Sequence, residues 1–202
     1  MRRLLSGFFV VVAFAGGTYF LVKTFQQNNV QPAYATVWPT PMPLPDFNLM
    51  DHTGRSVGRE NLDGKWHLVF FGFTHCPDIC PATLQQLSIA RQKLVESGAR
   101  IPEIILITVD PERDSPQIMA SYVGHFGPGV SGLTGKLDEL RKLTSTAGIF
   151  FEKVPLENGA YTVDHSAVVL LINDDAEIHA SFSAPHSVEN FVHDLPTLMG
   201  AN

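Results

Sequence analysis

The chain has 202 residues, of which 45% are hydrophobic, and this length can bury a core without disulfides. All 20 acidic residues lie at or after Asp46, where they outnumber 11 basic residues and give that part a net charge of −9. This balance argues against nucleic acid as a partner, because phosphate binding needs clustered Lys and Arg. Two cysteines are too few for a disulfide-rich secreted scaffold.

An uncharged stretch of 19 residues, 4–22, opens the chain. A helix of that length rises about 28 Å, near the thickness of the hydrocarbon core of a bilayer. We therefore expect residues 1–23 to form an N-terminal transmembrane helix that anchors the protein in the cytoplasmic (inner) membrane. Arg2 and Arg3 precede the stretch, so the positive-inside rule places the N-terminus in the cytoplasm and the domain in the periplasm or an equivalent compartment. The alternative is a cleaved signal peptide, for which residues 33–35 (AYA) have the small-x-small form.

Prolines dominate the next segment. They occupy every second position from Pro39 to Pro45, a spacing that favours extended polyproline-like chain and breaks helices. We expect residues 24–45 to be a Pro-rich linker that holds the domain of residues 46–202 off the membrane while keeping it nearby.

The domain alternates between strand and helix patterns. A nearly continuous apolar run at 66–73 is typical of a strand that is buried on both faces. Ser115 followed by Pro116 predicts a helix start, with an N-cap and then proline at the first helical position. The predicted strands are 47–51, 66–73, 103–109, 149–154, 161–163, 167–172 and 177–182, and the predicted helices are 81–97, 115–126, 137–147 and 187–198. This alternation predicts an α/β, thioredoxin-like fold with a central mixed sheet flanked by helices.

The two cysteines, Cys76 and Cys80, lie between the 66–73 strand and the helix that follows it. Pro81 suits the first helical position, which makes Cys80 the expected N-cap. The positive end of the helix dipole then favours thiolate over thiol, and thiolate is the form that binds metal or attacks a disulfide. Three intervening residues leave room for an ion between the sulfurs, and they also permit a disulfide bond.

A third ligand is expected, because two thiolates alone underfill most metal sites. Of the eight histidines, His165 stands just before the strand at 167–172, a junction that lies beside the first cysteine in a thioredoxin-like topology. Two Cys and one His suit Cu(I) and can also hold Cu(II) or Zn, and we expect one copper ion. Asp78 and Asp164 are candidates to hydrogen-bond near the ligands, and each can equally be a turn residue.

Four sequence runs together resemble the Sco/SenC family of anchored copper proteins. They are FGFTHCPDICP (71–81), VDPERDSP (109–116), GLTG (132–135) and YTVDHSAVVLLI (161–172), and the resemblance covers residues 46–198. It implies a thioredoxin fold, an N-terminal transmembrane anchor and one bound Cu(I) or Cu(II). By the same resemblance Cys76, Cys80 and His165 match the copper ligands, and Asp110 matches an acid close to the site.

The resemblance also implies a role in assembling the binuclear copper centre of cytochrome c oxidase. We expect a copper metallochaperone whose partners are the copper-bearing subunit of the oxidase and a copper donor chaperone. The alternative is a thiol-disulfide oxidoreductase that reduces the cysteines of that centre, with Cys76 and Cys80 as its redox-active pair. A peroxidase is a third hypothesis, because LPDF (44–47) resembles the opening of peroxiredoxins. Thr74 lies two residues before Cys76 where peroxiredoxins have a hydroxyl three before, which argues against this hypothesis.

Overall fold

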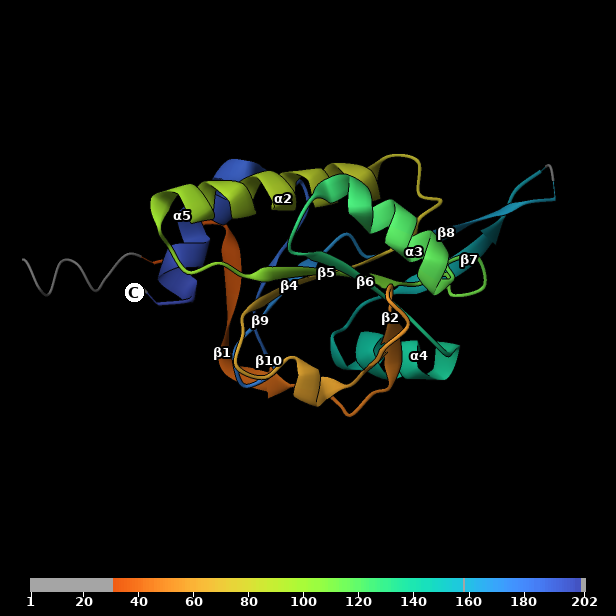
Figure 1. The fold of residues 1–202 in the computed structure, drawn as a ribbon, viewed down its shortest axis with the longest axis horizontal. Coiled ribbons are helices and arrows are strands. Elements are labelled where there is room, and N and C mark those ends of the chain that lie inside the picture. Colours follow the sequence, from red (N-terminus) through yellow and green to blue (C-terminus); the bar gives the residue numbers. More distant parts are fainter. Residues whose placement is uncertain (1–30, 158, 201–202) are drawn as a thin grey trace, which may run out of the picture. The chain divides into compact units, whose positions relative to one another are not determined.

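An eight-stranded mixed sheet runs through the middle of the protein (Figure 1). The computed structural model describes residues 31–157 and 159–200. The strand order is β1-β10-β9-β4-β5-β6-β2-β3, in which β4, β5 and β6 are parallel and the remaining pairs are antiparallel. The strands are β1 (Ala35–Pro43), β2 (Leu49–Asp51), β3 (Ser56–Val57), β4 (His67–Gly72), β5 (Glu103–Thr108), β6 (Val130–Thr134), β9 (Val169–Ile172) and β10 (Glu177–Phe182).

Helices cover both faces of this sheet. α2 (Ile79–Ser97) and α3 (Pro116–Val123) lie on one face, α4 (Leu137–Thr146) lies on the other, and α5 (Val188–Leu198) packs against α2 (Figure 1). Two 3-10 turns complete the elements, η1 (Arg59–Asn61) and η2 (Gly124–Phe126). Every residue of β4 is buried, so the core lies at the centre of the sheet. The predicted α/β fold with a central mixed sheet flanked by helices is confirmed.

A separate antiparallel hairpin is formed by β7 (Phe151–Pro155) and β8 (Tyr161–His165). Within the described part of the chain these two strands pair only with each other, and the hairpin projects away from the main sheet (Figure 1). The sequence predicts this pair at 149–154 and 161–163. The second strand runs two residues further than predicted, so that His165 is its last residue.

Residues 35–43 belong to the sheet, which corrects the predicted linker of residues 24–45. They form the edge strand β1, which pairs antiparallel with β10. The register shifts between Val37 and Met42, a segment in which the prolines have no N–H for the ladder. An edge strand tolerates proline because one of its sides has no partner strand, so alternating prolines are compatible with strand as well as with linker.

The sequence pattern does not predict β6, because Ser131 and Gly132 interrupt its apolar run. The structure shows why glycine stands there. A Cβ at Gly132 would lie 2.7 Å from Met119 Cε and 3.1 Å from Val123 Cγ1, both on α3. The close packing of α3 on β6 therefore depends on glycine at this position.

The predicted transmembrane anchor of residues 1–23 lies outside the described residues, as does the start of the predicted linker. In the ranges 31–157 and 159–200, none of the helices has both the length and the apolar character needed to cross a membrane. The longest of them, α2 with 19 residues, carries Arg91, Lys93 and Glu96.

A buried carboxylate fixes the point where the chain enters the sheet. Asp194 of α5 is fully buried and accepts hydrogen bonds from the amides of Ala33, Tyr34 and Ala35 at 2.9, 2.7 and 2.7 Å. Burial by itself would raise the pKa of Asp194. Hydrogen bonds from the Ala33 amide, from His193 and from the other two amides outweigh burial and hold this pKa below its ordinary value.

Asp194→Asn is expected to lower the free energy of unfolding by about 1.5–3 kcal/mol at pH 7, the range for hydrogen bonds to a charged group. A carboxyl with a depressed folded pKa stabilises the fold above its unfolded pKa, and this contribution is lost as pH falls through the folded pKa. The difference in the free energy of unfolding between wild type and variant should therefore become smaller below about pH 4. Chemical denaturation at neutral and at acid pH measures both values, and a gap that is unchanged in acid would contradict this account.

Candidate metal centre

The cysteine loop connects β4 to α2, and the helix begins earlier than the sequence predicts. α2 starts at Ile79 with Asp78 as its N-cap, so Cys80 is the second helical residue and the N-cap prediction is wrong. Pro81 is accommodated as the third residue because amides in the first turn have no intrahelical acceptor. Cys80 is consequently fully buried, whereas Cys76 is only partly buried in the loop.

Glycine at the end of β4 makes room for the sulfur of Cys80. A Cβ at Gly72 would lie 2.9 Å from Cys80 Sγ and 3.0 Å from the ring of Phe70. Both neighbours are fully buried and have little freedom to shift. The sulfur therefore lies directly against the backbone of a central strand, which holds this ligand in a fixed position.

Three ligand atoms converge beside the loop. The sulfurs of Cys76 and Cys80 and a ring nitrogen of His165 all lie within 4.8 Å of one another. Cys80 Sγ lies 3.4 Å from His165 Nε2, although the two residues are 85 positions apart in the chain. Neither cysteine forms a disulfide bond. The structure thus brings together the three residues that the sequence singles out as ligands.

The imidazole of His165 is oriented with Nε2 toward the sulfurs. Its Nδ1 lies 3.2 Å from the carbonyl oxygen of Ser166, to which it can only donate, so we assign a proton to Nδ1. Nε2, the nitrogen that faces the sulfurs, is the atom available to hydrogen-bond with them or to ligate a metal. The rings of Phe70 and Phe73 contact the imidazole at centroid distances of 5.8 and 5.9 Å, which limits its rotation.

The two sulfurs differ in acidity because they share a hydrogen bond. The Cys80 thiol donates a hydrogen bond to the sulfur of Cys76. Burial alone would raise the pKa of Cys76, but this hydrogen bond, together with those from His165 and from the amides of Cys80 and Asp78, outweighs burial and lowers the pKa to about 4. The same hydrogen bond, together with burial, raises the pKa of Cys80. At neutral pH the metal-free pair therefore consists of a partly exposed thiolate and a buried thiol.

A buried aspartate that no sequence pattern identifies as a site residue supports the loop ahead of Cys76. Asp114 accepts hydrogen bonds from the amide and hydroxyl of Thr74 at 3.0 and 2.6 Å and from the hydroxyl of Thr108 at 2.6 Å. Because Thr74 is two residues before Cys76, Asp114 fixes the backbone from which the first ligand projects. The sequence feature that could have pointed to it is the second aspartate of the VDPERDSP run, directly before the helix cap Ser115.

Asp110, the acid implied by the family resemblance, lies fully buried in the loop after β5. Its carboxylate accepts hydrogen bonds from Arg113 and from the hydroxyl of Tyr161. Asp110 therefore reaches the hairpin that carries the histidine through these two side chains.

Asp78 and Asp164 are both exposed. Asp78 reaches Cys76 through its backbone amide, which donates to the sulfur. Asp164 precedes the histidine on β8, and Nδ1 of His165 pairs with the carbonyl oxygen of Ser166. Side-chain roles for these two acids in holding the ligands stay predictions.

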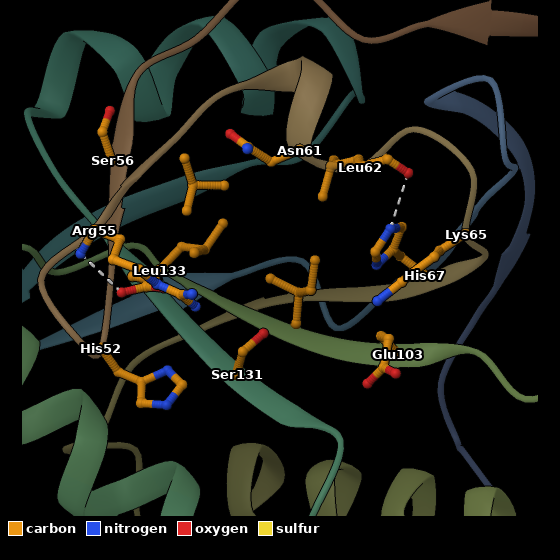
Figure 2. Close-up of a pocket in the computed structure, with 13 residues that line it drawn as sticks. His52, Arg55, Ser56, Asn61, Leu62, Lys65, His67, Glu103, Ser131 and Leu133 are labelled. Carbon is orange, nitrogen blue, oxygen red and sulfur yellow. Dashed lines mark hydrogen bonds and ion pairs between the residues drawn. The ribbon is translucent and has the colours of Figure 1, made fainter.

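A different pocket, of about 500 Å³, opens at the opposite end of the central strands (Figure 2). Its lining includes His67 and Glu103, the first residues of β4 and β5, and none of the three ligands. The histidines in this pocket have ordinary partners. His67 Nε2 lies 3.0 Å from the carbonyl oxygen of Leu62, and His52 Nδ1 accepts from the amide of Gly132 at 3.2 Å.

The fold and the site together define a thioredoxin-like domain with a candidate metal centre of two cysteines and one histidine. The chain belongs to the SCO1/SenC family, whose family model matches residues 27–200. One relative is the mitochondrial SCO2 homolog of Homo sapiens, which is 37% identical over 158 residues. That alignment covers 77% of this chain and 59% of the human protein, so the chain spans less than two thirds of this relative's length.

Two copper-bound structures are similar to this protein. Arabidopsis thaliana ScoI with copper bound is 34% identical, with a TM-score of 0.73 and coverage of 76% of this chain and 96% of that one. Bradyrhizobium japonicum ScoI with copper bound is 35% identical, with a TM-score of 0.66 and coverage of 76% and 97%. In this protein the Cys–Cys–His group has the ligand number and chemistry to fit one copper ion.

Proposed function

We propose that this protein is a copper metallochaperone that carries one copper ion on Cys76, Cys80 and His165. It delivers the ion to the copper-bearing subunit of cytochrome c oxidase for the binuclear copper centre. The observation that carries the proposal is the convergence of the three ligand atoms within 4.8 Å. Two thiolates and one imidazole suit Cu(I) and also hold Cu(II), and copper-bound relatives support copper over zinc.

The arrangement of the site suits ligand exchange as well as binding. Three protein ligands leave a coordination position free for an incoming ligand. Cys76 is partly buried and lines a surface groove of about 490 Å³ together with Pro77, Ile79 and Phe150. Cys80 is fully buried. We therefore expect a thiolate of the receiving protein to displace Cys76 first and Cys80 last.

The proposal includes attachment to the inner membrane through residues 1–23. The N-terminus then lies in the cytoplasm, and the metal centre lies in the periplasm or an equivalent compartment. The uncharged stretch 4–22 and the preceding Arg2 and Arg3 support this arrangement. A copper donor chaperone on the same side of the membrane loads the site.

A thiol-disulfide oxidoreductase is the second candidate function, and the unequal acidity of the two thiols favours it. The Cys76 thiolate attacks a disulfide of the oxidase copper site, and Cys80 then resolves the mixed disulfide. The products are a Cys76–Cys80 disulfide and two thiols on the oxidase subunit, and an external dithiol reductant must return the pair to the reduced form. His165 has no ligand role in this scheme.

His165→Ala is expected to lower the Cu(I) affinity of the full-length chain by more than about tenfold, the lower limit for removing even an outer partner of a metal ligand. Anaerobic competition with a chromophoric Cu(I) chelator measures the affinity, and X-ray absorption reports the loss of the nitrogen ligand. His125→Ala, which removes an exposed histidine from η2, is the control. Equal Cu(I) affinities in wild type and His165→Ala would contradict the three-ligand proposal. If neither wild type nor His165→Ala bound copper, and both reduced a disulfide substrate at equal rates, the reductase would be favoured over the metallochaperone.

A further inference from the structure

The hairpin that carries His165 is tied to the rest of the domain by side chains. Among the strands of residues 31–157 and 159–200, β7 and β8 pair only with each other, and Figure 1 shows the hairpin extending beyond the main sheet. Strand pairing with the main sheet therefore does not fix the distance from His165 to the cysteines. The position of the third ligand depends on the short connection from β8 to β9 and on contacts made by hairpin side chains.

Asp110, Arg113 and Tyr161 form a network that ties β8 to the loop after β5. Arg113 donates from Nε to Asp110 Oδ2 and from Nη1 to the carbonyl oxygen of Tyr161, the latter at 3.1 Å. The hydroxyl of Tyr161 completes the network by donating a hydrogen bond to Asp110 Oδ1 at 2.9 Å. The guanidinium carbon of Arg113 also lies 3.9 Å from the centroid of the Tyr161 ring, a cation–π contact. The network thus holds β8 at its first residue.

Burial makes this network costly to disturb. Asp110 is fully buried, and the side chain of Arg113 is 25% exposed. A buried carboxylate that loses its charged partner is left uncompensated in surroundings of low dielectric. Asp110 and Arg113 both belong to the loop, and the ion pair that joins this loop to the hairpin, Lys153 with Glu112, is exposed and contributes little. The Asp110–Arg113–Tyr161 network is therefore the main polar connection between the loop and the hairpin in the described part of the chain.

The network also reaches the cysteine loop through an aromatic side chain. The guanidinium carbon of Arg113 lies 5.7 Å from the centroid of the Phe73 ring, and Phe73 contacts the ring of His165 at 5.9 Å. The carbonyl oxygen of Phe73 accepts a hydrogen bond from the amide of Cys76 at 3.3 Å. Arg113 consequently contacts both the strand that carries the histidine and the loop that carries the first cysteine.

We infer that Arg113 and Tyr161 are positioning residues of the metal site. With Asp110 they hold β8 where His165 Nε2 stands 3.4 Å from Cys80 Sγ. The inference rests on the proposed copper-binding function. Neither residue binds the ion, and both act through the position of His165. Loosening the network should therefore remove the contribution of the imidazole and leave the two thiolates in place.

A double-mutant cycle in the full-length chain tests this inference. Arg113→Lys keeps the charge but loses the planar donor fork and its stacking, and Tyr161→Phe keeps the ring but loses the hydroxyl. Each should lower the Cu(I) affinity by about tenfold in the wild-type background. In the His165→Ala background each should lower it by less than about twofold, because the variants share one route to the ion. An equal loss in both backgrounds, or no loss in either, overturns the inference.

Arg91→Lys is the matched control. The side chain of Arg91 is 19% exposed, similar to the 25% of Arg113, and it pairs with Glu103 at the other end of the central strands. It also donates to the carbonyl oxygen of Pro102 at 3.2 Å. Arg91→Lys should leave the copper affinity unchanged in both backgrounds. If Arg91→Lys lowered the copper affinity as much as Arg113→Lys does, the loss would be a general result of replacing a packed arginine. That outcome would overturn the inference.

Hydrogen exchange on the metal-free chain separates this inference from the proposed function. Arg113→Lys and Tyr161→Phe should speed exchange of the β7 and β8 amides by about tenfold or more, while exchange in β4 and β5 stays unchanged. Unchanged exchange in the hairpin, or equal acceleration in all four strands, overturns the inference. A chain that binds no copper but shows faster exchange confined to the hairpin would refute the proposed function and support the positioning of the hairpin by the network.

Discussion

Cys76→Ser is expected to lower the Cu(I) affinity by more than about 100-fold, beyond the loss typical of removing an outer partner of a metal ligand. A serine hydroxyl is a hard, neutral ligand, whereas Cu(I) prefers a soft thiolate. Because Cys76 is only partly buried in its loop, the free energy of unfolding should change by less than about 1 kcal/mol. Competition with a Cu(I) chelator measures the affinity, and thermal unfolding of the metal-free chain measures the fold.

Cys80→Ser provides the comparison, because it should remove copper binding and also weaken the fold. The sulfur of Cys80 is buried against Gly72 and hydrogen-bonds to Cys76, whereas the shorter C–O bond of serine draws the hydroxyl away from that partner, which costs about 1–3 kcal/mol for a buried group. The pair of variants separates loss of a ligand from loss of stability. If Cys76→Ser still bound one Cu(I) as tightly as wild type, the proposed ligand set would be wrong.

Alkylation of the reduced, metal-free chain by iodoacetamide should be nearly independent of pH between about pH 5.5 and 8. Hydrogen bonding from Cys80 lowers the pKa of Cys76 to about 4, so its sulfur is thiolate across this whole range. The rate for an ordinary thiol rises about tenfold per pH unit over the same range, because only the thiolate reacts.

The shape of the pH profile is more informative than the absolute rate. An ordinary thiol of pKa 9.0 is roughly 0.1% thiolate at pH 6, so ionisation alone favours Cys76 by about 1000-fold. Thiolate nucleophilicity falls with pKa, with a Brønsted slope of about 0.4–0.5, and this offsets about 100–300-fold of that advantage. The net gain in rate is only about 3–10-fold, whereas a flat profile and a steep one are easily told apart.

Mass spectrometry identifies which sulfur has reacted, and Cys76→Ser should eliminate the pH-independent reaction. Cys80 should react slowly at every pH in this range, because it is buried and its pKa is raised. A rate at Cys76 that climbs steadily from pH 6 to 8 would mean that its sulfur is an ordinary thiol.

The central strands could be predicted from sequence because burial on both faces leaves an uninterrupted apolar run. The runs at 66–73 and 103–109 correspond to β4 and β5. β6 has no such run, since Gly132 serves the packing of α3, a contact that no local pattern records. The same limit applies to β1, because proline has the same local geometry in a free linker and in an edge strand, and the pairing partner β10 is far away in the chain.

The ligands could be predicted because the side chains of cysteine and histidine can bind a metal in any fold, and because each of these residues lies close to a predicted strand. The residues that hold the ligands could not be found in this way. Asp114 acts through Thr74, 40 positions away, and Arg113 acts through Tyr161, 48 positions away. Such pairs are created by the fold, and aspartate, arginine and tyrosine are common enough elsewhere that their presence alone indicates nothing.

Both borders of the main sheet are unsuited to recruiting another strand. On one side β1 carries Pro39, Pro41 and Pro43, which have no N–H to donate to an added strand. On the other side β3 is only two residues long. Unpaired strand edges are the usual template for aggregation between identical chains. Within the described residues, the main sheet therefore offers copies of this protein no suitable border from which to extend it, even though its interior is rich in β structure.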